Sequence, residues 1–124
     1  KMKEISYIHS EAYAAGELKH GTISLIEDGT LVIALGTYEP LFDKTMSNVK
    51  EVKARGARVL GVALEGNRAI YSEADDVILV PRMDDLFVVP AEIVPLQLFA
   101  YYVAKANGCA IDKPKNLAKS VTVE

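Results

Sequence analysis

Three short apolar runs divide the chain, and they cover residues 31–35, 58–64 and 77–80. Each run is largely continuous, without the polar alternation of a strand that has one face in water. Continuous runs of this length are typical of strands buried on both faces. Asp28-Gly29 precedes the first run and Pro81 follows the third. We therefore expect three buried strands.

Helical spacing fills the segment between the first two runs. From Leu41 to Arg55, apolar residues recur at Met46, Val49 and Val52 while lysine and glutamate occupy positions between them, and Gly56 follows. This spacing predicts an amphipathic helix that ends at the glycine, because glycine accepts the left-handed backbone of a helix terminus.

A second helix is predicted near the end of the chain, over residues 92–107, with Gly108 as its stop. Pro95 would then fall in the first turns of this helix, where a proline is tolerated. The preceding residues 83–90 are predicted to form a loop or a short extended piece. After the helix, the Pro-Lys-Asn sequence consists of residues that favour turns, so an irregular tail is predicted over residues 112–124.

The predicted elements alternate between helix and strand. Residues 1–26 are expected to be mostly helical, because small residues there permit close packing. Such alternation indicates an α/β fold with a parallel sheet and right-handed crossovers. A length of 124 residues predicts one domain. Three strands make a thin sheet, so we expect further elements of the fold to precede Lys1.

Composition narrows the class of protein. Half of the residues are apolar and a quarter are charged, as in soluble globular domains. A net charge of −3 and a pI near 5.4 disfavour nucleic acid as a partner. The one cysteine, Cys109, excludes an internal disulfide and a cysteine-based zinc site, and it favours a reduced cytoplasmic compartment. No apolar run approaches the ~20 residues of a membrane span, so no membrane contact is expected.

Three residue types could carry chemistry. Lys119 lies among small and apolar residues and could form a Schiff base with a sugar carbonyl if its amine were unprotonated; the alternative is a solvated tail lysine. His20 could move a proton during ring opening, or it could be a surface or helix-capping residue. Glu4 could act as a general base, or it could be a helix-surface carboxylate like Glu11 and Glu17.

Other kinds of site are disfavoured. No glycine-rich cradle followed by Lys-Ser or Lys-Thr is present for a phosphate. Asp75-Asp76 and Asp84-Asp85 are adjacent carboxylates without a nearby histidine, and such pairs are usually solvated. We therefore expect no metal site.

Two runs are specific enough to suggest a family: Gly16-Glu17-Leu18-Lys19-His20-Gly21, and Asn116-Leu117-Ala118-Lys119-Ser120-Val121-Thr122-Val123-Glu124. Together with residues 4–9, 11–13, 94–97, 100–101 and 114–115, they resemble the isomerase region of the glucosamine-6-phosphate synthases (glutamine–fructose-6-phosphate transaminases, isomerizing). The resemblance runs through the whole chain and is weak between residues 36 and 89. One departure is Thr22, where family members often have proline.

The resemblance implies a single SIS (sugar isomerase) domain over residues 1–124, the second of two in the family, with the catalytic lysine in the tail 112–124. In the family such a domain is a five-stranded parallel sheet in a three-layer α/β/α sandwich similar to flavodoxin. The phosphate-binding loop belongs to the first SIS domain, and the glutaminase nucleophile is an N-terminal cysteine. Neither corresponds to a position here, so the chain is expected not to turn over without the missing parts.

The resemblance also implies roles for particular residues. Lys119 resembles the Schiff-base lysine that opens fructose 6-phosphate, and Glu4 resembles the base that moves a proton between C1 and C2. His20 resembles the ring-opening acid/base that reaches the neighbouring subunit of a homodimer, and Lys1 resembles a lysine that supports the enediolate charge. Ala118 and Lys119 would bind the substrate.

The implied reaction converts fructose 6-phosphate and glutamine-derived ammonia into glucosamine 6-phosphate for hexosamine biosynthesis, without a metal or organic cofactor. The implied partners are the sugar phosphate, the first SIS domain, the glutaminase domain and a second copy of the chain. Two other hypotheses about the function stay open at this point. One is a non-catalytic SIS module that senses a sugar phosphate, and the other is a flavodoxin-like receiver or scaffold domain.

Overall fold

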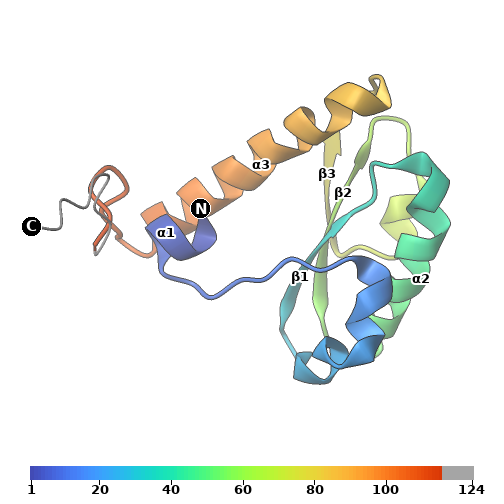
Figure 1. Cartoon of the computed structure of the whole chain (residues 1–124), viewed down its shortest axis with the longest axis horizontal. Coiled ribbons are helices and arrows are strands. Elements are labelled where there is room, and N and C mark those ends of the chain that lie inside the picture. The colour runs from blue at the N-terminus through green and yellow to red at the C-terminus, as the bar shows by residue number, and fades with distance from the viewer. Residues whose placement is uncertain (116–124) are drawn as a thin grey trace, which may run out of the picture. The chain divides into compact units, whose positions relative to one another are not determined.

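The chain packs into two compact units, which we describe separately (Figure 1). The computed structural model describes residues 1–115. The sheet unit comprises Ala12–Ile93, and the end unit comprises Lys1–Glu11 together with the chain from Val94 onward. The helix α3 (Asp85–Ala106) contributes to both units, with residues 85–93 in the first and residues 94–106 in the second.

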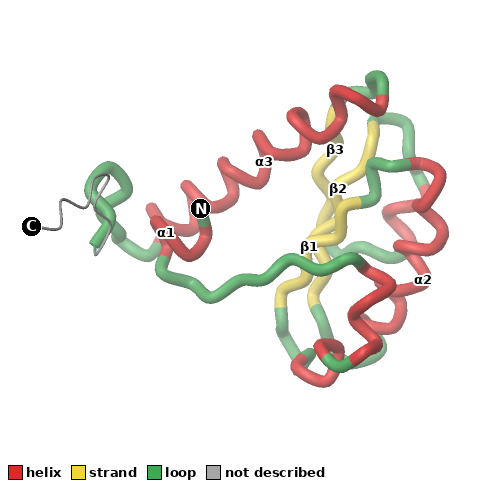
Figure 2. Tube along the Cα trace, viewed as in Figure 1, coloured by secondary structure: helices red, strands yellow, loops and turns green. Residues whose placement is uncertain are grey.

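A parallel sheet of three strands organises the sheet unit (Figure 2). The strands are β1 (Leu31–Leu35), β2 (Arg58–Leu64) and β3 (Asp76–Val80). They lie in the order β1-β2-β3, and both neighbouring pairs are parallel, with Ala34 opposite Gly61 and Val62 opposite Ile78. The three predicted strands and their parallel arrangement are thus confirmed. Their predicted burial is correct for β2 alone, because β1 and β3 are the outer strands and leave Leu31, Leu35 and Leu79 exposed.

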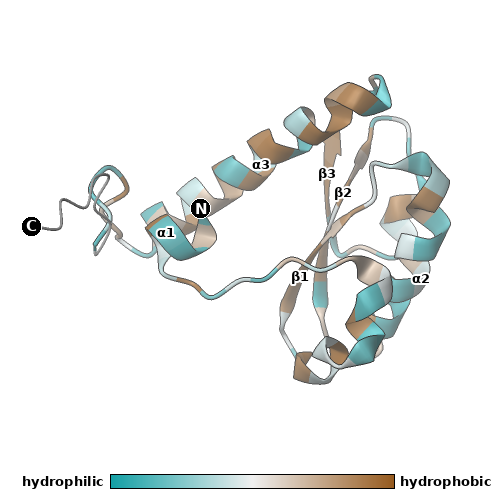
Figure 3. Cartoon of the chain, in the orientation of Figure 1, coloured by the Kyte–Doolittle hydropathy of each residue, from teal (hydrophilic) through white to brown (hydrophobic). Residues whose placement is uncertain are grey.

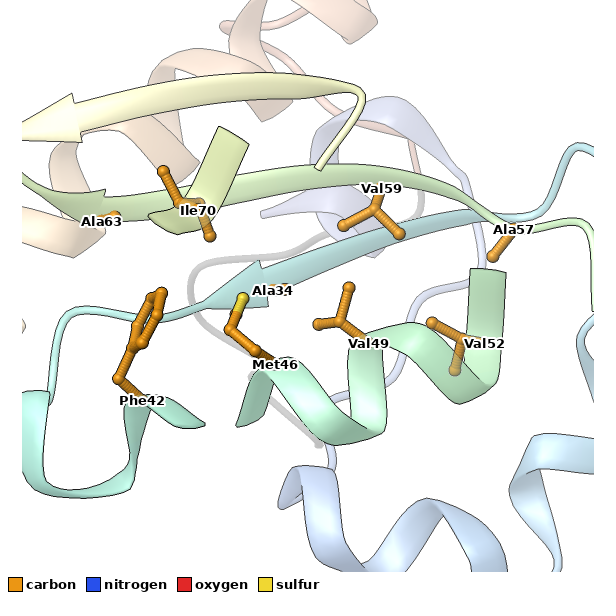
Figure 4. Close-up of a cluster of buried hydrophobic side chains, with 9 residues drawn as sticks. All are labelled: Ala34, Phe42, Met46, Val49, Val52, Ala57, Val59, Ala63 and Ile70. Atoms are coloured by element: carbon orange, nitrogen blue, oxygen red, sulfur yellow. The ribbon is translucent and has the colours of Figure 1, made fainter. Parts of the chain in front are cut away.

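The helix α2 (Phe42–Lys53) covers one face of this sheet. Its buried side chains Met46, Val49 and Val52 pack with side chains of β1 and β2, and Figure 4 shows this cluster. The predicted apolar stripe of this helix is therefore confirmed. Gly56, at φ 92°, ends the helical turn as expected, because its N–H donates to the carbonyl of Lys53.

The opposite face of the sheet is covered by the first turns of α3. Val88 of that helix packs with Val62, Leu64 and Val80, and all four side chains are buried. Helices on both faces of a parallel sheet make a three-layer α/β/α arrangement within the sheet unit. This confirms the predicted fold class.

The helix α3 begins earlier than the sequence predicts. Residues 83–90 were expected to form a loop, but the helix starts at Asp85 and continues through Pro90 and Pro95. The Asp84 carboxylate accepts a hydrogen bond from the N–H of Leu86 at 3.0 Å, which is the contact of a helix N-cap. Each proline removes one main-chain donor, and a helix of 22 residues retains the remaining bonds.

The prediction that residues 1–26 are mostly helical is wrong in its middle part. The helix α1 (Met2–Ser6) ends at Tyr7, and regular structure resumes only in the 3-10 helices η1 (Ala15–His20) and η2 (Thr22–Leu25). No residue between Tyr7 and Ala14 is buried. The segment therefore has no apolar face that could hold a helix against the rest of the protein. The short 3-10 helices η3 (Glu39–Leu41) and η4 (Ala69–Ser72) complete the set.

Hydrophobic residues are frequent in α3, above all in its first half (Figure 3). Several are well exposed, among them Leu86, Phe87, Val94 and Tyr102. Within residues 1–115 this one helix is long and apolar enough to cross a membrane by length and composition, a test that core helices of soluble proteins also pass. The expectation that no apolar run approaches such a length is thus wrong, because the helix extends back to Asp85.

Asp75, just before β3, is hydrogen-bonded to β2 through its side chain, and this contact should make the stability of the protein depend on pH. Its carboxylate accepts hydrogen bonds from the Val59 N–H at 2.7 Å and the Lys53 ammonium at 2.9 Å, and these contacts hold the pKa of Asp75 below its usual range. A carboxyl with a lowered folded-state pKa stabilises the protein above its unfolded-state pKa, and this contribution is lost as pH falls through the folded value. We expect Asp75→Asn to lower the urea midpoint of unfolding at pH 6. The difference in midpoint between the parent chain and Asp75→Asn should narrow below about pH 4.

The comparison is made by urea unfolding at several pH values, with Asp112→Asn as the control. Asp112 is exposed, and its substitution should leave the midpoint unchanged over the same range. If the difference in urea midpoint between the parent chain and Asp75→Asn stayed constant down to pH 3, the ionised Asp75 carboxylate would not be the source of the stability.

Candidate active site

Two of the predicted catalytic residues, Lys1 and Glu4, form a pair at the start of α1. The Lys1 Nζ atom lies 2.6 Å from Oε2 of Glu4, three residues along the chain. The Glu4 side chain is 35% exposed, so it can be reached from solvent while part of its surface is covered. The pair combines a carboxylate that can accept a proton with an ammonium that can stabilise a nearby oxyanion. The Lys1 ammonium is thus paired with the Glu4 carboxylate.

Packing in the end unit fixes the backbone beneath this pair. Ile5 is buried with Ala100 and Ala104 of α3, and Met2 packs against the same cluster. The buried Ser6 hydroxyl donates a hydrogen bond to the carbonyl of Ala100 at 3.0 Å. A helix of five residues would not persist unaided, so these contacts are what hold Glu4 in position.

His20 lies in the sheet unit, at the end of η1. Its side chain is 66% exposed, and its Nε2 atom is 3.9 Å from Oε2 of Glu17. An exposed imidazole can exchange protons with a bound molecule or with a neighbouring subunit. His20 and Glu4 belong to different units of the chain.

Lys119 and Ala118 lie outside the described residues, so their predicted roles remain predictions. Lys115 is the last described residue, and it makes a contact with Tyr7 that the sequence did not suggest. The Tyr7 hydroxyl accepts a hydrogen bond from the backbone N–H of Lys115. The two residues are 108 positions apart, and no motif or periodicity links them.

Three of the four aspartates in the two adjacent pairs have structural partners. Asp76 is paired with Arg58 at 2.9 Å, and Asp75 and Asp84 accept the main-chain hydrogen bonds described above. In the described range 1–115, no group of three or more His, Cys, Asp and Glu side chains is arranged to hold a metal ion. Two hollows within residues 1–115 are open to solvent, and neither is lined by Glu4 or His20.

Comparison with known proteins identifies the family. The SIS domain family matches residues 1–106. The chain belongs to the SIS domain family. This SIS domain is similar to curated proteins called glutamine–fructose-6-phosphate aminotransferase (isomerizing): 58% identical to that of Clostridium tetani, 59% to that of Clostridium acetobutylicum and 53% to that of Thermus thermophilus. Each match covers all of this chain and 20% of the relative, so the SIS domain spans about a fifth of their length.

A solved structure agrees with these relatives. The C-terminal domain of glucosamine-fructose-6-phosphate aminotransferase from Francisella tularensis superposes with a TM-score of 0.80 at 35% identity, over 90% of this chain and 32% of that one. The resemblance inferred from the two specific sequence runs is thereby confirmed, as is the SIS fold. The roles given to Lys1, Glu4, His20, Ala118 and Lys119 stay predictions.

One buried acid in the SIS domain was missed by the sequence analysis. Glu92 is 9% exposed, and burial raises its pKa. It continues a stripe of α3 in which Val88, Ala100 and Ala104 are also buried, at spacings of four or eight residues. The spacing of four from Val88 could have indicated that Glu92 is buried. The sequence instead predicted that the helix starts at Glu92, which hid this spacing.

Proposed function

We propose that this SIS domain is the C-terminal part of a glutamine–fructose-6-phosphate aminotransferase, in which it helps to convert fructose 6-phosphate and glutamine-derived ammonia into glucosamine 6-phosphate. The observation that carries the proposal is the identity of 53–59% to such enzymes along the entire chain. The pairing of Glu4 with Lys1 supports it, because sugar isomerisation needs a base and a stabilised oxyanion.

The proposed reaction begins at the C2 carbonyl of the sugar. His20 transfers a proton during ring opening, and the unprotonated amine of Lys119 attacks C2 of the open form and releases water to give a Schiff base. Ammonia then displaces the lysine and leaves an imine at C2. Glu4 removes a proton from C1 and returns it to C2, while the C1 hydroxyl loses a proton and the imine nitrogen gains one, so that C1 becomes the aldehyde and C2 carries the amino group of glucosamine 6-phosphate.

The geometry of α1 supports the proton-transfer step in particular. When Glu4 removes the C1 proton, negative charge develops on the sugar, and the Lys1 ammonium next to the carboxylate could stabilise that charge. The contacts of Ile5 and Ser6 with α3 fix α1, which carries Glu4 and begins directly after Lys1. A base that is held in place contributes to the rate through orientation as well as through its basicity.

The rest of the proposed enzyme lies outside this chain. The relatives are about five times longer than this chain. We propose that this chain is likewise part of a longer protein, which also contains a glutaminase domain and a first SIS domain that supplies the phosphate site. Exposed apolar side chains on α3, such as Leu86 and Phe87, support an assembly in which further protein covers this helix. We also propose a cytoplasmic homodimer in which the exposed His20 reaches the partner's site.

The test compares the longer protein with the 1–124 chain. With fructose 6-phosphate and ammonia, the longer protein should form glucosamine 6-phosphate, detected by mass spectrometry, and the 1–124 chain should form none. Binding of fructose 6-phosphate by the longer protein without any product, with glutamine or with ammonia, would favour the non-catalytic sensor instead.

A further inference from the structure

One tyrosine, directly after α1, joins this helix to the chain that follows α3. The Tyr7 hydroxyl oxygen lies 2.5 Å from the backbone nitrogen of Lys115 and accepts its hydrogen bond. The Lys115 Nζ atom lies 5.9 Å from the centroid of the Tyr7 ring, within the range of a cation–π contact. Both residues belong to the end unit, which also contains Lys1 and Glu4.

The backbone of Tyr7 has a conformation that residues with a side chain rarely adopt. Its φ is 56°, the one positive value at a non-glycine residue in the part of the chain that the structure describes. The Ile8 N–H donates to the carbonyl of Met2 at 3.4 Å, which closes α1 in the manner of a Schellman motif. Glycine usually occupies the left-handed position of this motif, because a side chain there costs free energy. A tyrosine at this position therefore points to a role for its side chain.

The segment after α3 gives the Tyr7 hydroxyl an anchored partner. Cys109 and Ile111 pack against the buried cluster of the end unit, to which Ile5 belongs. The Cys109 N–H also donates to a carbonyl of the last turn of α3 at 2.9 Å. Lys115 follows Ile111 by four residues. The hydroxyl therefore binds a stretch of chain that is itself held on α3.

The contact at Tyr7 differs in kind from the other contacts of α1. Ile5 and Ser6 attach the helix to α3 along one side. Contacts at two adjacent residues leave a short helix free to tilt about that side, and five residues make too few internal hydrogen bonds to resist the tilt. A contact at the end of the helix opposes this motion. The direction of Glu4 thus depends on both sets of contacts.

We propose that Tyr7 is a positioning residue for Glu4, an inference that rests on the function proposed above. Glu4 precedes Tyr7 by three residues, which is about 5 Å along a helix. A catalytic base has to be held within about 0.5 Å and 10–20° of its productive geometry. By binding the backbone of Lys115, Tyr7 fixes the end of α1 and with it the direction of the Glu4 carboxylate toward C1 of the sugar.

The expected size of the effect follows from the contacts that remain without the hydroxyl. A misplacement of about 1 Å can lower a rate by about 100-fold. Ile5 and Ser6 still hold α1 on α3, so the displacement of Glu4 should be smaller than this. We therefore expect the rate of the proton-transfer step to fall by about three- to tenfold.

The substitution Tyr7→Phe removes the hydroxyl and keeps the ring, and it is made in the longer protein. Fructose 6-phosphate deuterated at C1 is converted with ammonia in a single turnover, because deuterium slows the step assigned to Glu4 and gives it more control over the observed rate. The rate constant for glucosamine 6-phosphate formation should fall about three- to tenfold, and the amplitude should stay at the parent value. Loss of folded protein alone would lower the amplitude and leave the rate constant unchanged.

A second substitution separates the side chain of Tyr7 from its backbone. Glycine accepts a positive φ without strain, so Tyr7→Gly keeps the end of α1 and removes every contact with Lys115. Its rate constant should fall at least as far as that of Tyr7→Phe, whereas a parental rate constant would overturn the proposal. Tyr71→Phe is the matched control, since Tyr71 is an exposed tyrosine of the sheet unit, and it should keep the parent rate constant.

Two further measurements test whether Tyr7 acts through the proposed hydrogen bond and through Glu4. Hydrogen exchange of the peptide that contains Lys115 should be faster in Tyr7→Phe than in the parent. In a Glu4→Gln background, which lacks the base, Tyr7→Phe should change the single-turnover rate constant by less than about 1.5-fold. Unchanged exchange, or independent effects of the two substitutions that multiply, would overturn the proposal.

The outcomes separate this inference from the proposed function. A longer protein that forms glucosamine 6-phosphate with a rate constant unchanged by Tyr7→Phe supports the function and overturns the role of Tyr7. A longer protein that forms none overturns the function and, with it, the inference. A lower rate constant in Tyr7→Phe at the parent amplitude, absent in the Glu4→Gln background, supports both.

Discussion

Replacing Glu4 with glutamine in the longer protein is expected to lower kcat for glucosamine 6-phosphate formation about 10²- to 10⁴-fold, the contribution of a positioned general base. Glutamine has nearly the same shape as glutamate but does not accept a proton from carbon. The change leaves Ile5 and Ser6, the residues that fix α1, in place. KM for fructose 6-phosphate should therefore change little, and the loss should appear in kcat. The measurement is steady-state kinetics with ammonia as the nitrogen donor.

The control for this experiment is Glu27→Gln, because Glu27 is an exposed glutamate of the sheet unit. It should retain kcat within about twofold, as surface substitutions away from a site usually do. A Glu4→Gln protein with more than about a tenth of the parent kcat would show that another group moves the proton. Glu11 and Glu17, the other two candidates raised by the sequence, would then be tested in the same way.

The largest expected loss of stability comes from Ile70→Ala. Ile70 is fully buried in the cluster between α2 and the sheet (Figure 4). It packs closely over Gly61, where an added β-carbon would lie 2.7 Å from Cγ1 of Ile70. Replacing isoleucine by alanine in such a place removes apolar surface and leaves a cavity, which costs about 2–5 kcal/mol of the free energy of unfolding.

Urea unfolding of the 1–124 chain measures this loss, with Tyr71→Ala as the control. Tyr71 is the next residue along the chain, and its side chain is exposed, so its removal should cost about 0.5 kcal/mol or less. Ile70→Val should fall between the two, at about 0.5–1.5 kcal/mol. If Ile70→Ala cost no more than Tyr71→Ala, Ile70 would not belong to the core described here.

The strands and α2 could be predicted because a local signal specifies each of them. The apolar run at residues 58–64 reflects burial of β2 on both faces, whereas the run at residues 31–35 formed a strand that keeps Leu31 and Leu35 exposed, and the stop of α2 at Gly56 follows from its left-handed backbone. The start of α3 could not be predicted in this way. Pro90 and Pro95 indicated a break, but the buried Val88 and the cap at Asp84 hold the helix through both prolines.

The candidate site was only partly accessible from the sequence. Glu4, His20 and Lys119 were suggested by residue type and by a family resemblance, and the pair of Lys1 with Glu4 follows from their spacing on a helix. The contact of Tyr7 with Lys115 could not be predicted, because it joins residues 108 positions apart through a hydroxyl and a backbone N–H. Local patterns contain no information about such a pair.

The most direct test of the central claim is to trap the sugar on the tail lysine. The longer protein is incubated with fructose 6-phosphate and borohydride, digested, and mapped by mass spectrometry, with Lys119→Met as the test and Lys113→Met as the control. The account predicts one sugar adduct on Lys119, lost in Lys119→Met and retained in Lys113→Met. An adduct on a different residue, or no adduct from a protein that forms glucosamine 6-phosphate, would contradict it.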